Sequence, residues 1–289
     1  MTASAPARVL LGTHTWAASA DAARRNAHGI ASLHALRDVD IVNVQFRDRP
    51  HEYPGLETAA VMPNDSNVIT RRKGPRKPIM FELFDALARE ASARAIPYFC
   101  FTNTDILVSQ PAIDWIHQAG KDAYIFSRRN FDGTTGAPLN IEFAGYDVYA
   151  IRPAWWFRHR HRFRAYIAGE GIWDEVYTTI VMCHADAAIE NRLSLVRHEA
   201  HPMVPVPSKE FGRYIQMLAA FDAGYFSVWC QYYVGVTALR EAGAGLEEEE
   251  AFARQVFVWR PGAADRVIQV ARNVKAVARY ELWKLANPD

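Results

Sequence analysis

A carboxylate and an amide follow a short apolar segment at Tyr98–Phe101, where the sequence reads YFCFTNTDILVS. The polar residues include Asn103 and Asp105, and the chain returns to apolar residues at Ile106. Ligands of open parallel sheets bind at the carboxyl ends of the strands, so Asp105 can project into a ligand crevice. Magnesium and manganese prefer oxygen ligands and take only a few of them from protein. The position predicts a divalent-cation site, with capping of the following turn as the alternative.

A basic segment precedes this region and runs from Arg71 to Lys77, with five Lys and Arg side chains. It leads into an apolar helical pattern, and backbone amides at a helix start together with nearby cations can bind an anion such as a diphosphate. A solvated basic loop is the alternative. The segment lacks the GxxxxGK[ST] pattern, so a Walker-type NTPase is not indicated.

A tryptophan and two acidic residues, Trp173, Asp174 and Glu175, open another polar region. A hydroxyl is a poor nucleophile at neutral pH, and a carboxylate within hydrogen-bond reach can take its proton. In the alternative, Asp174 caps a helix over 175–183 and Trp173 packs in the core.

Two histidines, His198 and His201, lie three positions apart in the sequence His-Glu-Ala-His. The zincin pattern HExxH needs a spacing of four, so these residues do not form that motif. They can act as metal ligands or as structural histidines bonded to the backbone. Pro202 follows His201 and predicts extended chain there.

The elements that must position these groups alternate between strand and helix. Strand patterns cover 8–12, 40–46, 98–101, 122–127 and 145–151, and helix patterns cover 19–35, 78–93 and 110–119. This order predicts an α/β fold with a mostly parallel sheet flanked by helices. Residues 47–77 and 128–140 read as loops, and from Ser208 the pattern is helical.

Composition limits the classes of function and the compartment. The 33 Lys and Arg nearly balance the 32 Asp and Glu, so no nucleic-acid partner is expected. The three cysteines form no CxxC pair, which is typical of a reducing compartment. The apolar stretch 217–238 is interrupted by Asp222 and Gln231, so it predicts a core helix and not a membrane span. The N-terminal apolar stretch is too short for a signal peptide, and we expect a cytoplasmic protein.

The order of these groups resembles the nucleotide-diphospho-sugar transferases, the GT-A class of glycosyltransferases. Asn103-Thr104-Asp105 is similar to their DxD motif in a degenerate form, with Asn103 at the first acidic position. The resemblance implies a GT-A-like, Rossmann-like nucleotide-sugar-binding and catalytic domain over 7–205. It also implies a C-terminal helical extension over 206–289, packed on that domain.

The resemblance implies a hexosyltransferase-like enzyme that moves a sugar from a nucleotide-diphosphate donor to a hydroxyl of a glycan, lipid or small-molecule acceptor. The implied roles are nucleotide-sugar binding by Thr13, Arg72, Lys77, Asn103 and Asp105; base catalysis by Asp174, with Glu175 as second choice; acceptor stacking on Trp173; and binding of Mg or Mn by Asp105 and His201, with His198 as the alternative ligand.

Two other functions remain open from the sequence. A non-catalytic nucleotide-sugar or carbohydrate-binding relative is favoured by the missing first carboxylate at Asn103. A metal-dependent hydrolase could be built on Asp105, His198 and His201. No transmembrane segment is expected, and peripheral contact with a membrane stays open.

Overall fold

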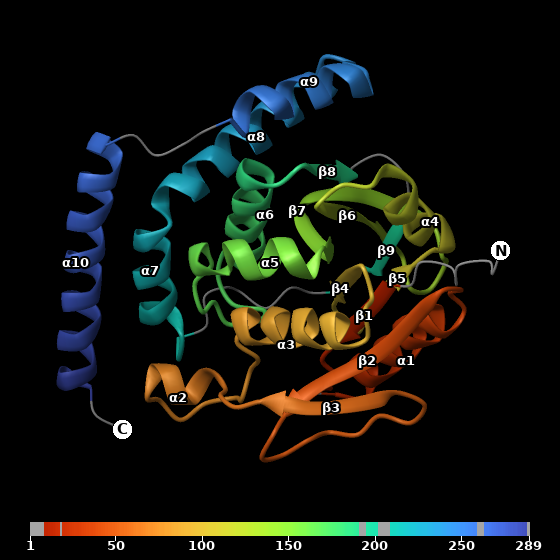
Figure 1. Cartoon of the computed structure of the whole chain (residues 1–289), viewed down its shortest axis with the longest axis horizontal. Coiled ribbons are helices and arrows are strands. Elements are labelled where there is room, and N and C mark those ends of the chain that lie inside the picture. Colours follow the sequence, from red (N-terminus) through yellow and green to blue (C-terminus); the bar gives the residue numbers. More distant parts are fainter. Residues whose placement is uncertain (1–8, 18, 191–194, 202–208, 259–262, 288–289) are drawn as a thin grey trace. The chain divides into compact units, whose positions relative to one another are not determined.

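The computed structural model of the chain describes residues 9–17, 19–190, 195–201, 209–258 and 263–287 (Figure 1). The chain divides into two compact units. The first unit comprises Met1–Asn64, Phe81–His161 and Ala185–Pro202, and the second comprises Asp65–Met80, Arg162–His184 and Met203–Asp289. Pro202 and the expected domain boundary between residues 205 and 206 lie outside the described residues.

A central sheet forms the first unit (Figure 1). Its strands are β1 (Val9–Thr13), β2 (Val39–Phe46), β3 (Glu57–Met62), β4 (Tyr98–Thr102), β5 (Ile106–Val108), β6 (Ala123–Phe131), β7 (Pro138–Ile151), β8 (Ala187–Glu190) and β9 (Val196–Glu199). The order is β3-β2-β1-β4-β7-β6-β9-β5, and β8 also pairs with β6. Among the described strands, five pairings are parallel and three are antiparallel. Two of the three antiparallel pairings involve β7.

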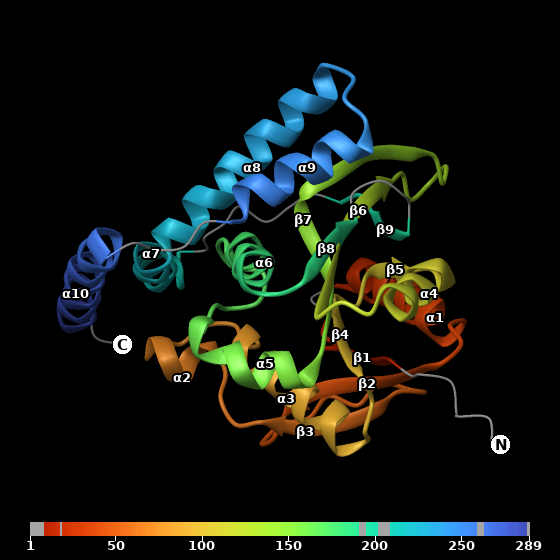
Figure 2. The ribbon, with the colours of Figure 1, turned by 45° about the horizontal axis from the view of Figure 1, so that its top comes forward.

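Helices cover both faces of this sheet, as Figure 2 shows. They are α1 (Ala20–His34), α3 (Met80–Ala93), α4 (Gln110–Ala119) and α5 (Pro153–His159). The predicted helix over 110–119 is confirmed. The N-cap of α1 is Ser19, whose hydroxyl accepts a hydrogen bond from the backbone N–H of Ala22. The predicted α/β class, with a mostly parallel sheet between helices, is therefore confirmed.

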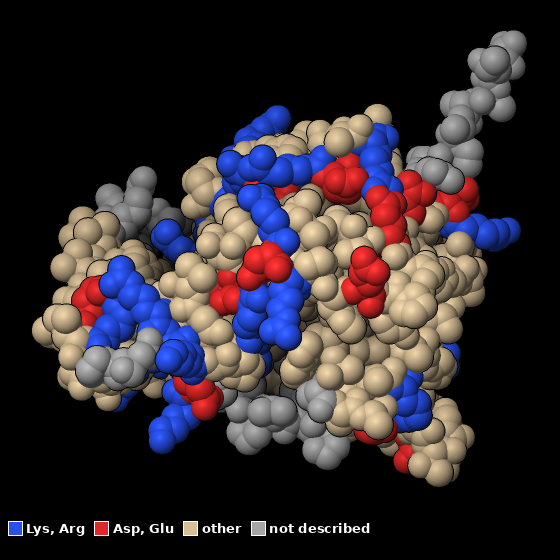
Figure 3. All heavy atoms as spheres, turned by 90° about the horizontal axis from the view of Figure 1, so that it is seen from below, with Lys and Arg blue, Asp and Glu red and all other residues tan. Residues whose placement is uncertain are grey.

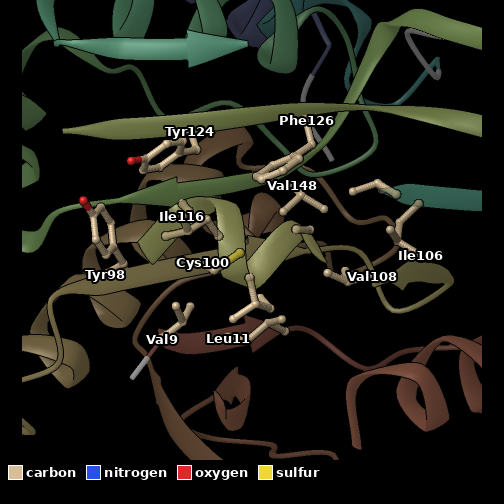
Figure 4. Packing of buried hydrophobic residues seen from close by; sticks show 14 of the residues in the cluster. Val9, Leu11, Tyr98, Cys100, Ile106, Val108, Ile116, Tyr124, Phe126 and Val148 are labelled. Carbon is tan, nitrogen blue, oxygen red and sulfur yellow. The ribbon is translucent and has the colours of Figure 1, made fainter. Parts of the chain in front are cut away.

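One face of the sheet packs against α1 and α4. Side chains alternate between the two faces along a strand, so Val9 and Leu11 of β1 point to the same side. Cys100 of β4 joins them, and Ile116 of α4 covers them (Figure 4). All four side chains are buried.

The opposite face is built from aromatic rings of β4, α3 and α5. Phe99 and Phe101 alternate with Cys100 and therefore point to this side. The ring of Phe84 lies with its centroid 5.9 Å from that of Phe99 and 5.5 Å from that of Phe101. Trp156 of α5 packs on Phe84 at 5.5 Å. Because both faces are covered, all five residues of β4 are buried, as expected of a central strand.

The predicted loops at 47–77 and 128–140 were partly wrong. The first contains β3 and the short helix α2 (Ser66–Thr70). β3 is an edge strand in which five of the six residues are at least partly exposed, so it shows no clear apolar alternation. In the second predicted loop, strand β6 continues as far as Phe131. This part of β6 contains Arg128, which forms an ion pair with Asp147 of β7.

The predicted helix start at Pro78 was also wrong, because α3 begins at Met80. The backbone N–H of Met80 donates to the carbonyl of Tyr166, and Ile79 forms an isolated antiparallel bridge with Ile167. These bonds hold the chain extended up to the helix.

The second unit is mostly helical. Besides α2 it contains α6 (Trp173–His184), α7 (Gly212–Phe221), α8 (Ala223–Glu241), α9 (Leu246–Val256) and α10 (Ala263–Ala286). α10 packs on α7, and α8 packs on α6 and α9. The apolar stretch 217–238 belongs to two helices that meet at Asp222, and none of the described helices is long and apolar enough to cross a bilayer.

Asp222 is a buried carboxylic acid of the second unit, and its ionisation should affect the stability of the fold. The residue is 3% exposed and accepts a hydrogen bond of 3.1 Å from the hydroxyl of Tyr166. Burial raises the pKa of Asp222 to about 7, although the charge of Arg164 and the bond from Tyr166 act to lower it. Because this value lies above that of an unfolded chain, the folded state binds an extra proton between about pH 4 and pH 7, and stability falls as pH rises through this window.

We therefore expect Asp222→Asn to gain stability relative to the wild type as pH rises. Between pH 4 and pH 8 the difference in unfolding free energy should shift in favour of the variant by on the order of 2–4 kcal/mol. Urea unfolding of both proteins at the two pH values measures this shift. An identical difference at both pH values would contradict the assignment.

Candidate active site

Asp105 lies in the turn between β4 and β5, where the sequence predicted the end of a strand. The register of the sheet then brings a distant residue to it. β5 pairs with β9 antiparallel, with Ile106 opposite His198. β9 also pairs with β6, which places Asn130 opposite His198. The turn after β4 thus meets the segment that carries both histidines.

Three side chains converge at this point. Oδ2 of Asp105 lies 3.6 Å from Nε2 of His198 and 3.4 Å from Nε2 of His201. The two histidine Nε2 atoms are 3.1 Å apart. A triangle with these sides has a centre about 2.0 Å from each corner, which is the ligand distance of Mg²⁺ and of Zn²⁺. Among the described residues, Asp105, His198 and His201 therefore form a candidate metal centre.

The donor chemistry of the cluster suits a cation. Nδ1 of His198 lies 3.1 Å from Oδ1 of Asn130. When Nδ1 donates to that oxygen, the proton is held on the far side of the ring, and the lone pair of Nε2 faces Asp105 and His201. Asn130 thus lies where a hydrogen-bond partner would orient the ring of a metal-ligating histidine. Asn130 could not be predicted as a site residue, because residues 128–140 read as a loop in the sequence.

The carboxylate of Asp105 is kept ionised. Burial alone would raise the pKa of Asp105, but when His198 and His201 are protonated, the hydrogen bond with His198 and the two histidine charges hold that pKa below its ordinary value. A deprotonated carboxylate is the form that binds a cation.

Helix α1 supports the turn that contains Asp105. Asn26, Gly29 and Ser32 recur every three residues and so share one face of the helix. Oδ1 of Asn26 accepts a bond of 3.0 Å from the hydroxyl of Thr104, and the hydroxyl of Ser32 accepts one of 3.3 Å from the N–H of Val108. A Cβ on Gly29 would overlap the carbonyl oxygen of Thr104. Glycine is therefore needed for the close approach of helix and turn.

Gly29→Ala is expected to destabilise the protein by about 1–3 kcal/mol, since the backbone of the turn must move away. This loss should exceed the roughly 1 kcal/mol that alanine gains over glycine within a helix. Divalent-cation binding should weaken as well, because Asp105 follows Thr104. Thermal unfolding and Mn²⁺ titration measure both effects. Gly74→Ala is the control, since the atoms nearest to its Cβ lie at 3.6 Å; equal effects of the two substitutions would contradict the role of Gly29.

Asn103, at the first position of the degenerate motif, contacts an aspartate outside the metal cluster. Its amide nitrogen donates to Oδ1 of Asp147 at 2.8 Å. Asp147 is buried on β7 and forms an ion pair with Arg128. An aspartate at 103 would oppose a second buried carboxylate, which gives a physical reason for the amide at this position.

Asn103→Asp should therefore not restore a metal ligand. We expect a loss of about 1–3 kcal/mol in unfolding free energy, because Asp147 loses a donor and meets a like charge. Mn²⁺ affinity should not rise. Urea unfolding and calorimetric titration test this, and tighter Mn²⁺ binding at unchanged stability would contradict it.

Glu199 lies between the two histidines in sequence but is directed elsewhere. Side chains alternate along β9, and the carboxylate of Glu199 accepts a hydrogen bond of 2.9 Å from Nη1 of Arg24. The hydrogen bonds and charge of Arg24 hold the pKa of Glu199 below its ordinary value, against a smaller effect of burial. Glu199 is thus committed to α1 and does not belong to the metal cluster.

A buried polar network at the ends of β1 and β2 was missed from the sequence. Oδ1 of Asn43 accepts from the N–H of Thr15 at 3.0 Å and from Nε2 of Gln45 at 2.8 Å. Burial lowers the pKa of His14 to about 4, although its bond to the carbonyl of Val44 acts in the other direction. Its ring is therefore neutral near pH 7. The alternation of Asn43 and Gln45 within an apolar strand was the signal that could have revealed the network.

Thr13, a predicted nucleotide ligand, ends β1 beside this network. β1 and β4 run parallel, with Gly12 paired to Phe101, so Thr13 and the turn after β4 share one edge of the sheet. The hydroxyl of Thr13 is buried and has no hydrogen-bond partner among the described residues.

The basic segment belongs to the second unit, and both of its predicted nucleotide ligands, Arg72 and Lys77, already have partners there. Nζ of Lys77 lies 2.6 Å from a carboxylate oxygen of the buried Glu170. The guanidinium of Arg72 lies 4.3 Å above the ring of Trp283. Lys and Arg lie beside Asp and Glu across the face shown in Figure 3.

The predicted catalytic carboxylates lie in the first turn of α6. The helix begins at Trp173, so Asp174 is a first-turn residue and not the N-cap. Trp173 is 6% exposed, and its ring meets that of Tyr177 edge-on at 5.8 Å. One carboxylate oxygen of Glu175 is buried without a hydrogen-bond partner in the described ranges.

Comparison with solved structures identifies the fold. The structure of S. aureus TarS 1–349 in complex with UDP-GlcNAc is 11% identical, with 97% of this chain and 92% of that chain covered and a TM-score of 0.51. A candidate nucleotide-diphospho-sugar transferase from Desulfovibrio desulfuricans G20 is 11% identical, with 86% and 96% covered and a TM-score of 0.41. The mannosyltransferase PcManGT from Pyrobaculum calidifontis, in complex with GDP-Man and Mn²⁺, is 12% identical, with 98% and 76% covered and a TM-score of 0.41.

No protein-family model and no curated protein sequence matches the chain. The likeness to the TarS structure extends over nearly the whole of both chains. It confirms the GT-A-like α/β fold that the sequence predicted.

Proposed function

We propose that this protein is a metal-assisted glycosyltransferase, which transfers a sugar from a nucleotide-diphosphate donor to a hydroxyl of a glycan, lipid or small-molecule acceptor. The observation that carries this function is the convergence of Asp105, His198 and His201 at the carboxyl end of a central strand in a GT-A-like fold. In sheets of this kind that edge is where ligands bind.

Asp105 and His201 would hold a Mg²⁺ or Mn²⁺ ion, with His198 as a further ligand. Such an ion, when bound, neutralises charge on the diphosphate oxygens of the donor. Asn130 orients His198 for this role through its 3.1 Å contact. The buried hydroxyl of Thr13 lies on the same sheet edge and can hydrogen-bond the donor.

Asp174 would take the proton of the acceptor hydroxyl, with Glu175 as the second candidate. Both are in the first turn of α6. The proposed site leaves out Trp173 as an acceptor platform, because its ring is buried. It also leaves out Arg72 and Lys77, because Trp283 and Glu170 already contact them.

The experiment is calorimetric titration of the protein with a panel of UDP- and GDP-sugars, with and without Mn²⁺. UDP-GlcNAc comes first, because it is the ligand in the TarS structure. We expect one donor to bind, at least tenfold more tightly with Mn²⁺ present. Failure of every nucleotide sugar to bind would overturn the proposal. Tight binding without transfer to any acceptor would instead support the non-catalytic relative.

A metal-dependent hydrolase is the second candidate, and the composition of the cluster favours it. Two histidines and one carboxylate form the protein ligand set of several zinc hydrolases, which leave a fourth position open. Elemental analysis of the purified protein separates the two functions. Stoichiometric zinc that survives purification would favour the hydrolase, whereas a transferase should bind Mg²⁺ or Mn²⁺ reversibly.

A further inference from the structure

Among the described residues, helix α10 packs on the rest of the second unit along one side. Tyr280 and Ala276 are buried on that side, and the ring of Tyr280 lies 5.6 Å from that of Tyr214 in α7. Helices α7 and α10 lie side by side in Figure 1. The hydroxyl of Tyr280 donates to the carbonyl of Thr70 at 3.2 Å. The guanidinium that stacks on Trp283 adds a contact on this side. The helix is therefore held in place with its other side facing outward.

The outward side carries an apolar stripe, defined here as Val267, Val270, Val274, Leu282 and Leu285. Val267, Val274 and Leu285 lie within about 20° of one another on a helix with 3.6 residues per turn. They are 70%, 65% and 79% exposed. Single exposed apolar residues are ordinary on protein surfaces, but a row of five along one helix indicates a binding face.

Three exposed cations border this stripe. Arg272, Lys275 and Arg279 all lie between the apolar stripe and the buried side, along the same flank of the helix. The one acidic side chain described on α10 is Glu281, whose charge is paired with Lys284 at 2.6 Å. The outward face thus combines an apolar row with a net positive flank.

We propose that this face of α10 binds the surface of a membrane rich in anionic phospholipid. A helix with an apolar face and basic flanks lies in the plane of the interface, with its apolar side chains among the acyl chains and its cations at the headgroups. Charge complementarity selects this occupant over a second copy of the chain, because the only described anion on an identical surface is Glu281, which is already paired with Lys284. This inference does not depend on the function of the Asp105 cluster.

Flotation of the full chain with vesicles tests the inference. The vesicles contain either phosphatidylcholine alone or a mixture with phosphatidylglycerol. Binding is expected to the anionic vesicles and to be much weaker with phosphatidylcholine alone. The triple variant R272Q/K275Q/R279Q should bind anionic vesicles about a hundredfold more weakly, since each cation contributes roughly a factor of five near such a surface.

Two further variants make the result specific. V267Q/V274Q/L285Q replaces the three aligned residues at the centre of the apolar stripe, keeps good helix formers in α10 and should also abolish binding. R37Q/R49Q/R158Q removes three exposed cations from other helices and loops and should bind as the wild type does.

Equal binding of the wild type and both α10 variants would overturn the inference. The inference would also be overturned if the wild type did not bind vesicles but formed a dimer in light scattering, and V267Q/V274Q/L285Q were a monomer. The face would then bind a second copy of the chain. Circular dichroism of each variant confirms that the helices are retained.

Discussion

Asp105→Asn is expected to lower the rate of sugar transfer by on the order of a thousandfold, because binding of a divalent cation supplies several kcal/mol of transition-state stabilisation. The substitution keeps the shape of the side chain and removes the charge that faces His198 and His201. Mn²⁺-dependent donor binding should fall in parallel. Initial rates and calorimetric titration of the same preparation measure the two effects.

Asp114→Asn is the matched control for this substitution. Asp114 is an exposed carboxylate of the first unit that accepts a hydrogen bond of 2.9 Å from Gln110. Its removal should leave both rate and Mn²⁺ affinity unchanged. If Asp105→Asn kept full stimulation by Mn²⁺, the assignment of Asp105 as a metal ligand would be wrong.

Asp174→Asn is expected to reduce turnover by about 10²–10⁴-fold, the usual contribution of a general base, with little change in donor affinity. The amide has the size of the carboxylate but cannot accept the acceptor's proton. Steady-state rates at saturating donor, with donor affinity measured separately, resolve the two quantities.

Glu175→Gln distinguishes between the two neighbouring carboxylates. The residue has one buried oxygen without a hydrogen-bond partner in the described part of the chain, so the variant should fold and should lose less activity than Asp174→Asn. The opposite order would make Glu175 the base. Wild-type rates in both variants would remove this turn of α6 from the catalytic machinery.

Local patterns were enough to predict many elements of the first unit. The apolar run at Tyr98–Phe101 and its polar end identified β4 and the turn that carries Asp105. The helix over 110–119 followed from its spacing of apolar residues. Edge strand β3 and the polar end of β6 were missed, because neither has an apolar alternation that marks a strand.

Contacts between distant segments could not be read from local patterns. His198 meets the Asp105 turn because β9 pairs with β5 in one particular register. The bond between Asn103 and Asp147 joins residues that are 44 positions apart, so the reason for an amide in the motif became visible only in the fold. The same holds for Gly29, whose missing side chain makes room for the backbone of Thr104.

A crystal structure of the protein with Mn²⁺ and a nucleoside diphosphate, recorded at a wavelength where manganese scatters anomalously, tests the central claim most directly. We predict one strong anomalous peak about 2.1 Å from Oδ2 of Asp105 and Nε2 of His201, in contact with diphosphate oxygens. A bound nucleotide with no manganese at Asp105, or manganese bound only elsewhere, would contradict the proposed site.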